Sequence, residues 1–195
     1  MIWHRHLAEM AETVEKAREM ASSVEKAAKV VANALLSGRR VFAFGNGGSA
    51  TQSQHLAAEL VVRYQDDRRA LPGIALTTDT AILTACANDY DFESIFSRQV
   101  EALGLPGDVA FALTTSGRSP NVLKALAAAK ERGLTTVFLT GERGRGEAAR
   151  WDVGVVVPSA ETAHVQEIHL AVIHAVCRAV DESLAAAGGA GSATR

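Results

Sequence analysis

The sequence is poor in cysteine, proline and aromatic residues, and this scarcity excludes several classes of protein. Its 195 residues include two cysteines, four prolines and 5% aromatic side chains. Cys86 and Cys177 each lie in an apolar helical context, without the CxxC spacing of a metal site or the cysteine density of a disulfide framework. We expect both to be reduced core thiols of a cytoplasmic protein.

An excess of charge of one sign and long apolar runs are also missing. The formal net charge is -2 and the isoelectric point is near 6.3, so no broad basic field attracts nucleic acid. No stretch approaches the ~18 consecutive apolar residues of a membrane span, and the N-terminus lacks the apolar segment of a secretion signal. We therefore expect neither nucleic acid nor a membrane as partner. We interpret His4 and His6 as a polar helix start outside any site.

The length fits one domain with a helical arm at its N-terminus. Residues 7–36 show the pattern of two helices with a capping box at Ser22–Glu25 between them, and Gly38 predicts the end of the second. We expect the arm, residues 7–37, to pack with a partner subunit; a solvated arm is the alternative. The second helix places four apolar residues on one stripe: Val24, Ala28, Val31 and Leu35.

From Arg40 onward, short apolar runs alternate with longer amphipathic stretches. This alternation is typical of an α/β fold with a five-stranded, mostly parallel, doubly wound sheet flanked by helices. The predicted strands cover residues 41–44, 74–77, 109–114, 136–140 and 153–157.

Proline and glycine mark the boundaries of the later elements. Pro120 predicts the first turn of a helix and Gly133 its end. The charged, glycine-rich stretch Gly141–Gly146 is predicted to be a mobile loop, and residues 188–195 a disordered tail. The predicted single domain thus spans residues 1–187.

A glycine-serine loop, Gly45–Ser49, connects the first predicted strand to a helix. Small residues at such a junction leave backbone N–H groups and the helix N-terminus open to an anion. In that helix His55 and Glu59 are four residues apart and share one face. A plain turn and a solvated surface pair are the alternatives, but the direct succession of loop and pair favours a phosphate cradle beside an acid–base or metal pair.

A second strand–loop–helix unit places four hydroxyl groups directly before a helix, on Thr114, Thr115, Ser116 and Ser119. Together with the helix N-terminus, such a loop is able to hold a phosphate, whereas an ordinary N-cap needs only one hydroxyl. Both loops follow the carboxyl ends of predicted parallel strands, where open α/β sheets bind their ligands. We therefore expect the two loops to serve one pocket.

Neither loop matches a nucleotide-binding motif. The first loop, Gly-Asn-Gly-Gly-Ser, has no Gly-Lys-Ser/Thr after it and does not fit the GxGxxG fingerprint of dinucleotide-binding proteins. The expected ligand is therefore a phosphorylated small molecule.

The last long helix carries further polar candidates on a packed element. Gln166 and His174 lie off the centre of its apolar stripe, separated by ~12 Å of helical rise. To reach one metal or substrate, their side chains must lean together or come from two subunits, and His169 is a competing ligand candidate. The stripe consists of Val165, Ile168, Val172, Val176 and Val180.

In these motifs the chain resembles the sugar isomerase (SIS) domain, and within it the phosphoheptose, or sedoheptulose-7-phosphate, isomerases. The resemblance covers nearly the whole chain and extends beyond the two loops to Ala87–Asp89, Phe96–Arg98, Gln166–His169 and Val172–His174. It implies conversion of D-sedoheptulose 7-phosphate to D-glycero-D-manno-heptose 7-phosphate, the first step towards ADP- or GDP-heptose. It also implies a homotetramer with one Zn²⁺ ion per subunit.

Ketose–aldose isomerisation needs a base and an acid or metal, and Glu59 and His174 are our candidates for base and acid. Because glutamine is an unusual zinc ligand, the metal set rests mostly on the resemblance. That set is His55, Glu59, Gln166 and His174. The substrate contacts that the resemblance implies are Asn46, Gly47, Gly48, Glu59, Asn88, Asp89, Thr114, Thr115, Ser116, Ser119 and Gln166.

The chain departs from the family pattern in the hydroxyl loop and before Gln166. Thr114 stands for a serine and Arg118 for an asparagine, and Ala163–His164 replace an Asp-Arg pair. Phosphate binding should survive, because threonine keeps the hydroxyl and arginine adds positive charge. The alternatives are an isomerase of another sugar phosphate and a non-catalytic regulator that binds a replication initiator. Such regulators lack the helix glutamate and late histidine, which are present here as Glu59 and His174.

Overall fold

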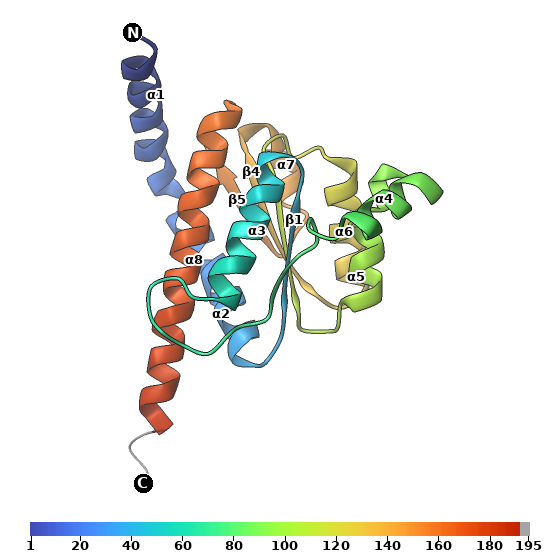
Figure 1. The fold of residues 1–195 in the computed structure, drawn as a ribbon. Coiled ribbons are helices and arrows are strands. Elements are labelled where there is room, and N and C mark those ends of the chain that lie inside the picture. The colour runs from blue at the N-terminus through green and yellow to red at the C-terminus, as the bar shows by residue number, and fades with distance from the viewer. Residues whose placement is uncertain (192–195) are drawn as a thin grey trace.

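The computed structural model describes residues 1–191 and folds them as helices on both faces of one sheet (Figure 1). The sheet has five strands in the order β2-β1-β3-β4-β5, and every neighbouring pair is parallel. The predicted α/β, doubly wound fold is therefore confirmed. The strands are Val41–Gly45 (β1), Gly73–Ala75 (β2), Val109–Thr114 (β3), Thr135–Gly141 (β4) and Val153–Val157 (β5).

One face of the sheet packs against α2 (Ala21–Leu36), α3 (Gly48–Val61) and α8 (Thr162–Gly191), which lie together in Figure 1. Alternate strand residues such as Phe111 and Leu139 belong to this layer, because successive strand side chains point to opposite faces. The apolar stripe of α8 and most of that of α2 are buried here, as the sequence predicted.

The opposite face carries the other half of the core, with Phe42, Phe44 and Phe138 at its centre. Because both faces are covered, β1 and β3 are buried along their whole length, and this explains their continuous apolar sequences. The covering helices are α4 (Thr80–Asp89), α5 (Ser97–Leu103), α6 (Pro120–Glu131) and α7 (Arg145–Ala148), with the 3-10 turn η2 (Phe92–Ser94).

The N-terminal arm is almost continuous helix: α1 (Ile2–Ala17) passes through the 3-10 turn η1 (Arg18–Met20) into α2. The predicted capping box at Ser22–Glu25 is wrong, since these residues lie inside α2 and the Ser23 hydroxyl donates to the Met20 carbonyl at 2.8 Å. No glycine or proline interrupts the helical backbone at this junction.

Helix α1, the first half of the arm, is weakly buried within this chain. Thr13 is the one buried residue of α1, whereas Trp3, Leu7 and Val14 are exposed. The apolar face of α1 is therefore open to a further packing partner.

Two boundary predictions differ from the structure. Gly141–Gly146 is not an irregular loop, because the 3-10 turn η3 (Glu142–Gly144) and α7 occupy it. A Cβ on Gly144 would overlap the Thr140 hydroxyl and crowd the Gly117 Cα, so this glycine permits close packing rather than mobility. Helix α8 continues to Gly191, past the predicted start of a disordered tail at 188; residues 192–195 lie outside the described residues.

Both cysteines are free and buried, as predicted, and burial raises the pKa of the Cys177 thiol to about 12. Within residues 1–191, no helix has the length and apolar character needed to cross a membrane.

Candidate functional site

The two predicted ligand loops lie beside each other at a switch in strand order. The chain leaves β1 through α3 to reach β2 on one side, and then returns to place β3 on the other side of β1. Gly45 pairs with Leu113, so the loops that follow these residues begin side by side. Crevices at such switch points are where open α/β sheets bind ligands.

A pair of amide side chains joins the two loops. Asn46 Nδ2 donates to Asn121 Oδ1 at 2.9 Å, and Asn121 Nδ2 donates back to Asn46 Oδ1 at 2.8 Å. Asn121 is buried and also accepts a hydrogen bond from the Val122 amide at 2.9 Å. Sequence reasoning selected Asn46 but missed Asn121, whose one signal was an amide in the first turn of the helix after the hydroxyl loop.

The glycines of the first loop are required by geometry. Gly47 has φ +54° and precedes α3, in a backbone conformation that favours glycine. A Cβ on Gly48 would overlap the side-chain amide of Gln166, so this glycine lets α8 approach the start of α3. The loop therefore serves helix packing as well as any ligand.

The hydroxyl groups of the second loop face one another instead of capping the helix that follows. Thr114 Oγ1 lies 2.9 Å from Ser119 Oγ and 3.4 Å from Ser116 Oγ, which also accepts the Arg118 amide at 3.2 Å. Ser119 occupies the N-cap position of α6, yet its side chain makes no capping hydrogen bond. An ordinary N-cap therefore does not account for this loop, and its hydroxyls are grouped at a helix N-terminus.

The structure brings three of the predicted catalytic and metal-binding residues together, which we call the site cluster: His55, Glu59 and His174. The Nε2 atoms of the two histidines are 3.0 Å apart, and His55 Nε2 is 3.4 Å from Glu59 Oε1. The side chains of His55 and Glu59 are 40% and 19% exposed, so the cluster is accessible to a small molecule. Helices α3 and α8 thus supply one polar centre.

Sequence reasoning missed two residues that support the site cluster from behind. The Tyr64 ring stacks on His174, with ring centres 5.6 Å apart. Arg68 donates from Nη2 to the Glu59 carbonyl at 2.7 Å and from Nε to Asp181 Oδ1 at 2.7 Å. The Arg68–Asp181 ion pair is buried, and it fixes the C-terminal turn of α3 against α8. Both residues follow α3 in an irregular segment, where no periodicity points to a site.

Gln166 contacts α3 at the start of that helix, before His55 and Glu59. Its side chain packs against Gly48, and its carbonyl accepts a hydrogen bond from Gln52 Nε2 at 2.6 Å. On α8 it is ~12 Å along the helix axis from His174. The contribution of Gln166 to a metal site stays a prediction.

The donor set of the site cluster suits zinc. Histidine nitrogen and carboxylate oxygen are usual zinc ligands, and donors bound at 2.0–2.2 Å in a tetrahedral site are about 3.3 Å apart. The spacings of 3.0 and 3.4 Å around His55 Nε2 agree with that value. His55 therefore lies at ligand spacing from both His174 and Glu59, whereas the ligand atoms of Glu59 and His174 are more than 4.8 Å apart and would have to approach each other to share one ion.

His169, the competing ligand candidate, is enclosed in the core. It has no exposed surface, neither ring nitrogen has a hydrogen-bond partner in the described part of the chain, and burial lowers its pKa to about 4. It is a neutral core residue that a ligand cannot reach.

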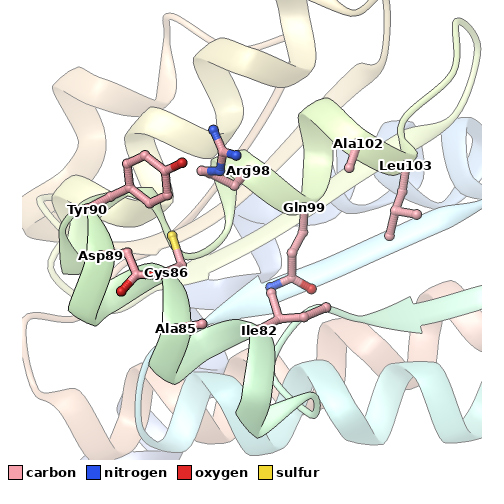
Figure 2. A pocket seen from close by; sticks show the side chains of 9 residues that line it. All are labelled: Ile82, Ala85, Cys86, Asp89, Tyr90, Arg98, Gln99, Ala102 and Leu103. Carbon is pink, nitrogen blue, oxygen red and sulfur yellow. The ribbon is translucent and has the colours of Figure 1, made fainter.

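Asn88 and Asp89 are exposed at the end of α4, where Asn88 Nδ2 donates to Asp89 Oδ1 at 2.7 Å. Asp89 borders a largely apolar pocket of about 330 Å³ between α4 and α5 (Figure 2). Ile82, Cys86 and Leu103 line this pocket, together with Arg98, whose guanidinium lies over the Tyr90 ring at 4.5 Å. A substrate role for Asn88 and Asp89 stays a prediction.

A second histidine–glutamate group, which we call the arm cluster, consists of His6, His164 and Glu167. Among residues 1–191 it is the one group of three His, Cys, Asp or Glu side chains whose ligand atoms all lie within 4.8 Å of one another. It is therefore able to hold a metal ion. From the sequence, His6 indicated only a polar helix start outside any site, and no local pattern connects the start of α1 to α8.

The chain is similar to known proteins over most of its length. The SIS domain family matches residues 5–141. A phosphoheptose isomerase of Paramagnetospirillum magneticum is 48% identical over 91% of this chain and 93% of its own length, and one of Aquifex aeolicus is 53% identical over 80% and 81%. Among solved structures, phosphoheptose isomerase GmhA from Neisseria gonorrhoeae superposes with a TM-score of 0.87 at 40% identity, covering 93% of this chain and 100% of that one.

Proposed function

We propose a sugar-phosphate isomerase function for this chain, which belongs to the SIS-domain family and, within it, to the phosphoheptose isomerases. The substrate is D-sedoheptulose 7-phosphate and the product D-glycero-D-manno-heptose 7-phosphate, a precursor of ADP- or GDP-heptose. The observation that carries the proposal is the convergence of His55, Glu59 and His174 in a chain that also has a hydroxyl-lined loop.

Glu59 and His174 supply the proton transfers. Glu59 takes a proton from C1 of the ketose, while His174 donates a proton to the carbonyl oxygen on C2, giving an enediol. Return of a proton to C2 and loss of one from the C1 hydroxyl complete the aldose, so no redox partner is needed. The buried Arg68 holds the main chain at Glu59 and thereby orients the base.

In the alternative role of these side chains, His55, Glu59 and His174 would instead hold the zinc ion, with Gln166 as a fourth ligand from a rearranged side chain or another subunit. When bound, zinc supplies Lewis-acid stabilisation of negative charge on a substrate oxygen. Its position at the site cluster is supported by the donor types and their spacing.

The loops divide the binding of the substrate between them. Thr114, Thr115, Ser116 and Ser119 receive the phosphate together with the N-terminus of α6, because hydroxyl donors and the helix dipole both favour an anion. The sugar hydroxyls lie against the first loop, at Asn46, Gly47 and Gly48, with Asn88, Asp89 and Gln166 as further contacts.

We also infer a cytoplasmic homotetramer. The apolar residues that α1 leaves exposed, among them Ile2, Trp3 and Leu7, support burial of the arm between subunits. The two free, buried thiols agree with a reducing compartment.

A turnover assay on the purified chain tests the proposed function. We expect the chain to convert sedoheptulose 7-phosphate faster than it converts five- and six-carbon ketose phosphates in the same panel. Glu59→Gln, prepared in parallel, controls for a contaminating isomerase and should be inactive. If the chain leaves sedoheptulose 7-phosphate unchanged both with and without added zinc, the proposal is wrong. If the chain prefers another ketose phosphate, the proposed substrate is wrong but the proposed isomerase reaction stands.

A further inference from the structure

We propose that the arm cluster is a second metal site, in which His6, His164 and Glu167 bind a divalent transition metal such as zinc and so fasten α1 to α8. This site is separate from the site cluster and does not depend on the isomerase function. Its ligands come from the first two turns of α1 and α8.

The spacing of the three side chains is that of ligands around one ion. His6 Nε2 lies 2.9 Å from Glu167 Oε1, and the rings of His6 and His164 have centres 5.2 Å apart. Since zinc ligands in a tetrahedral site are about 3.3 Å apart, an ion requires only small side-chain shifts. Two imidazoles and one carboxylate leave the fourth position for water, as in zinc sites with three protein ligands.

The second oxygen of Glu167 is a separate observation that favours cation binding. Although the Glu167 side chain is 38% exposed, its Oε2 atom is buried and has no hydrogen-bond partner among residues 1–191. A buried acceptor without a partner costs roughly 1–3 kcal/mol, and more if it carries charge. The His6 contact satisfies only Oε1, so a cation that binds the carboxylate would account for both oxygens.

The surroundings of His164 are those of a metal ligand. His164 is 5% exposed, and its ring lies against that of His6, which also stacks on Trp3 at 6.1 Å. An imidazole kept this close to another imidazole and a carboxylate is arranged as a ligand. Ala163–His164 is also where the chain departs from the family pattern.

Such an ion would stabilise the packing of α1 on α8. Helix α1 buries only Thr13 against the rest of the chain, so packing alone holds the arm weakly. Consecutive residues of α8 differ by about 100° around the helix axis, which separates Glu167 from the neighbouring Gln166. A metal at Glu167 therefore fixes the arm without using the side chain assigned to the isomerase site.

Metal titration of tag-free protein tests the site. Metal-depleted protein is titrated with Zn²⁺, and with Co²⁺ followed by its visible absorption, in the unaltered chain, His6→Ala and His4→Ala. His4 is an exposed histidine of the same helix and serves as the matched control. We expect His6→Ala to bind one equivalent less than the unaltered chain, and His4→Ala to bind the same amount.

Hydrogen exchange reports the structural consequence. Zn²⁺ should slow exchange of the amides in residues 2–17 of the unaltered chain and of His4→Ala, but not of His6→Ala. Glu167→Gln, checked for native circular dichroism, provides a second variant and should also lose one equivalent. Equal stoichiometry in the unaltered chain and His6→Ala overturns the proposal, whatever the turnover assay shows, because only the difference of one equivalent reports this site.

Discussion

Helix α8 contributes to two histidine–glutamate clusters. Their side-chain types are alike, but the helices that complete them are packed differently. At the site cluster, α8 meets the well-packed helix α3, and the buried Arg68–Asp181 pair holds the end of α3 in place. At the arm cluster, α8 meets α1, which buries a single residue. Donor identity alone therefore does not distinguish the two clusters; the packing of the helices that carry them does.

The largest expected difference between the two clusters is the effect on kcat of replacing one carboxylate in each by an isosteric amide. We expect Glu59→Gln to lower kcat about 10²- to 10⁴-fold, because general acid–base catalysis contributes that much. Glu167→Gln should leave kcat within about two-fold, since this residue has no place in the proposed proton transfers. Steady-state kinetics on both variants measures the contrast, and equal losses would contradict the assignment of catalysis to the site cluster.

Removal of the buried arginine should destabilise the end of α3. Arg68→Met leaves Asp181 charged and unpaired in the interior, which costs about 3–5 kcal/mol. The double variant Arg68→Met/Asp181→Leu should recover much of that loss, because no isolated charge remains. Urea unfolding measures both, and a loss below about 1 kcal/mol in the single variant would show that the ion pair does not support the site cluster.

Acid should weaken α8 between the two clusters, at His169. The folded-state pKa is lowered to about 4 by burial, whereas an unfolded histidine titrates near 6.5. Stability from this group is therefore complete above about pH 6.5 and falls as the pH drops towards 4, with a loss of about 2 kcal/mol between pH 7.5 and 5. In urea unfolding of His169→Gln, the free energy of unfolding should depend on pH less by that amount. If the pH dependence is unchanged, another group takes up the proton.

The smallest expected effect belongs to the hydroxyl loop, which neither cluster contacts in our assignment. Ser119→Ala should raise KM for the sugar phosphate about ten-fold with little change in kcat, because a hydrogen bond to a charged group contributes about 1.5–3 kcal/mol. Ser23→Ala, whose hydroxyl donates only to a carbonyl within the arm, is the control. A loss confined to kcat would argue against a phosphate-binding role.

The elements of the fold could be predicted because their signals are local. The strand bounds of β3 and β5 agree with the sequence prediction, and Pro120 begins α6 as expected. The errors also have local causes. Ser22–Glu25 matches the sequence pattern of a capping box. The chain there passes from α1 through η1 into α2 without leaving a free helix terminus to cap.

Local sequence patterns were enough to predict the layers, the two loops and the side chains available for chemistry, because strand and helix periodicities and turn residues act over a few positions. Which of these side chains meet depends on the tertiary structure. His55 contacts His174 across 119 positions, His6 contacts Glu167 across 161, and the amides of Asn46 and Asn121 pair across 75. Such contacts depend on how helices pack on the sheet, and no local pattern specifies that packing.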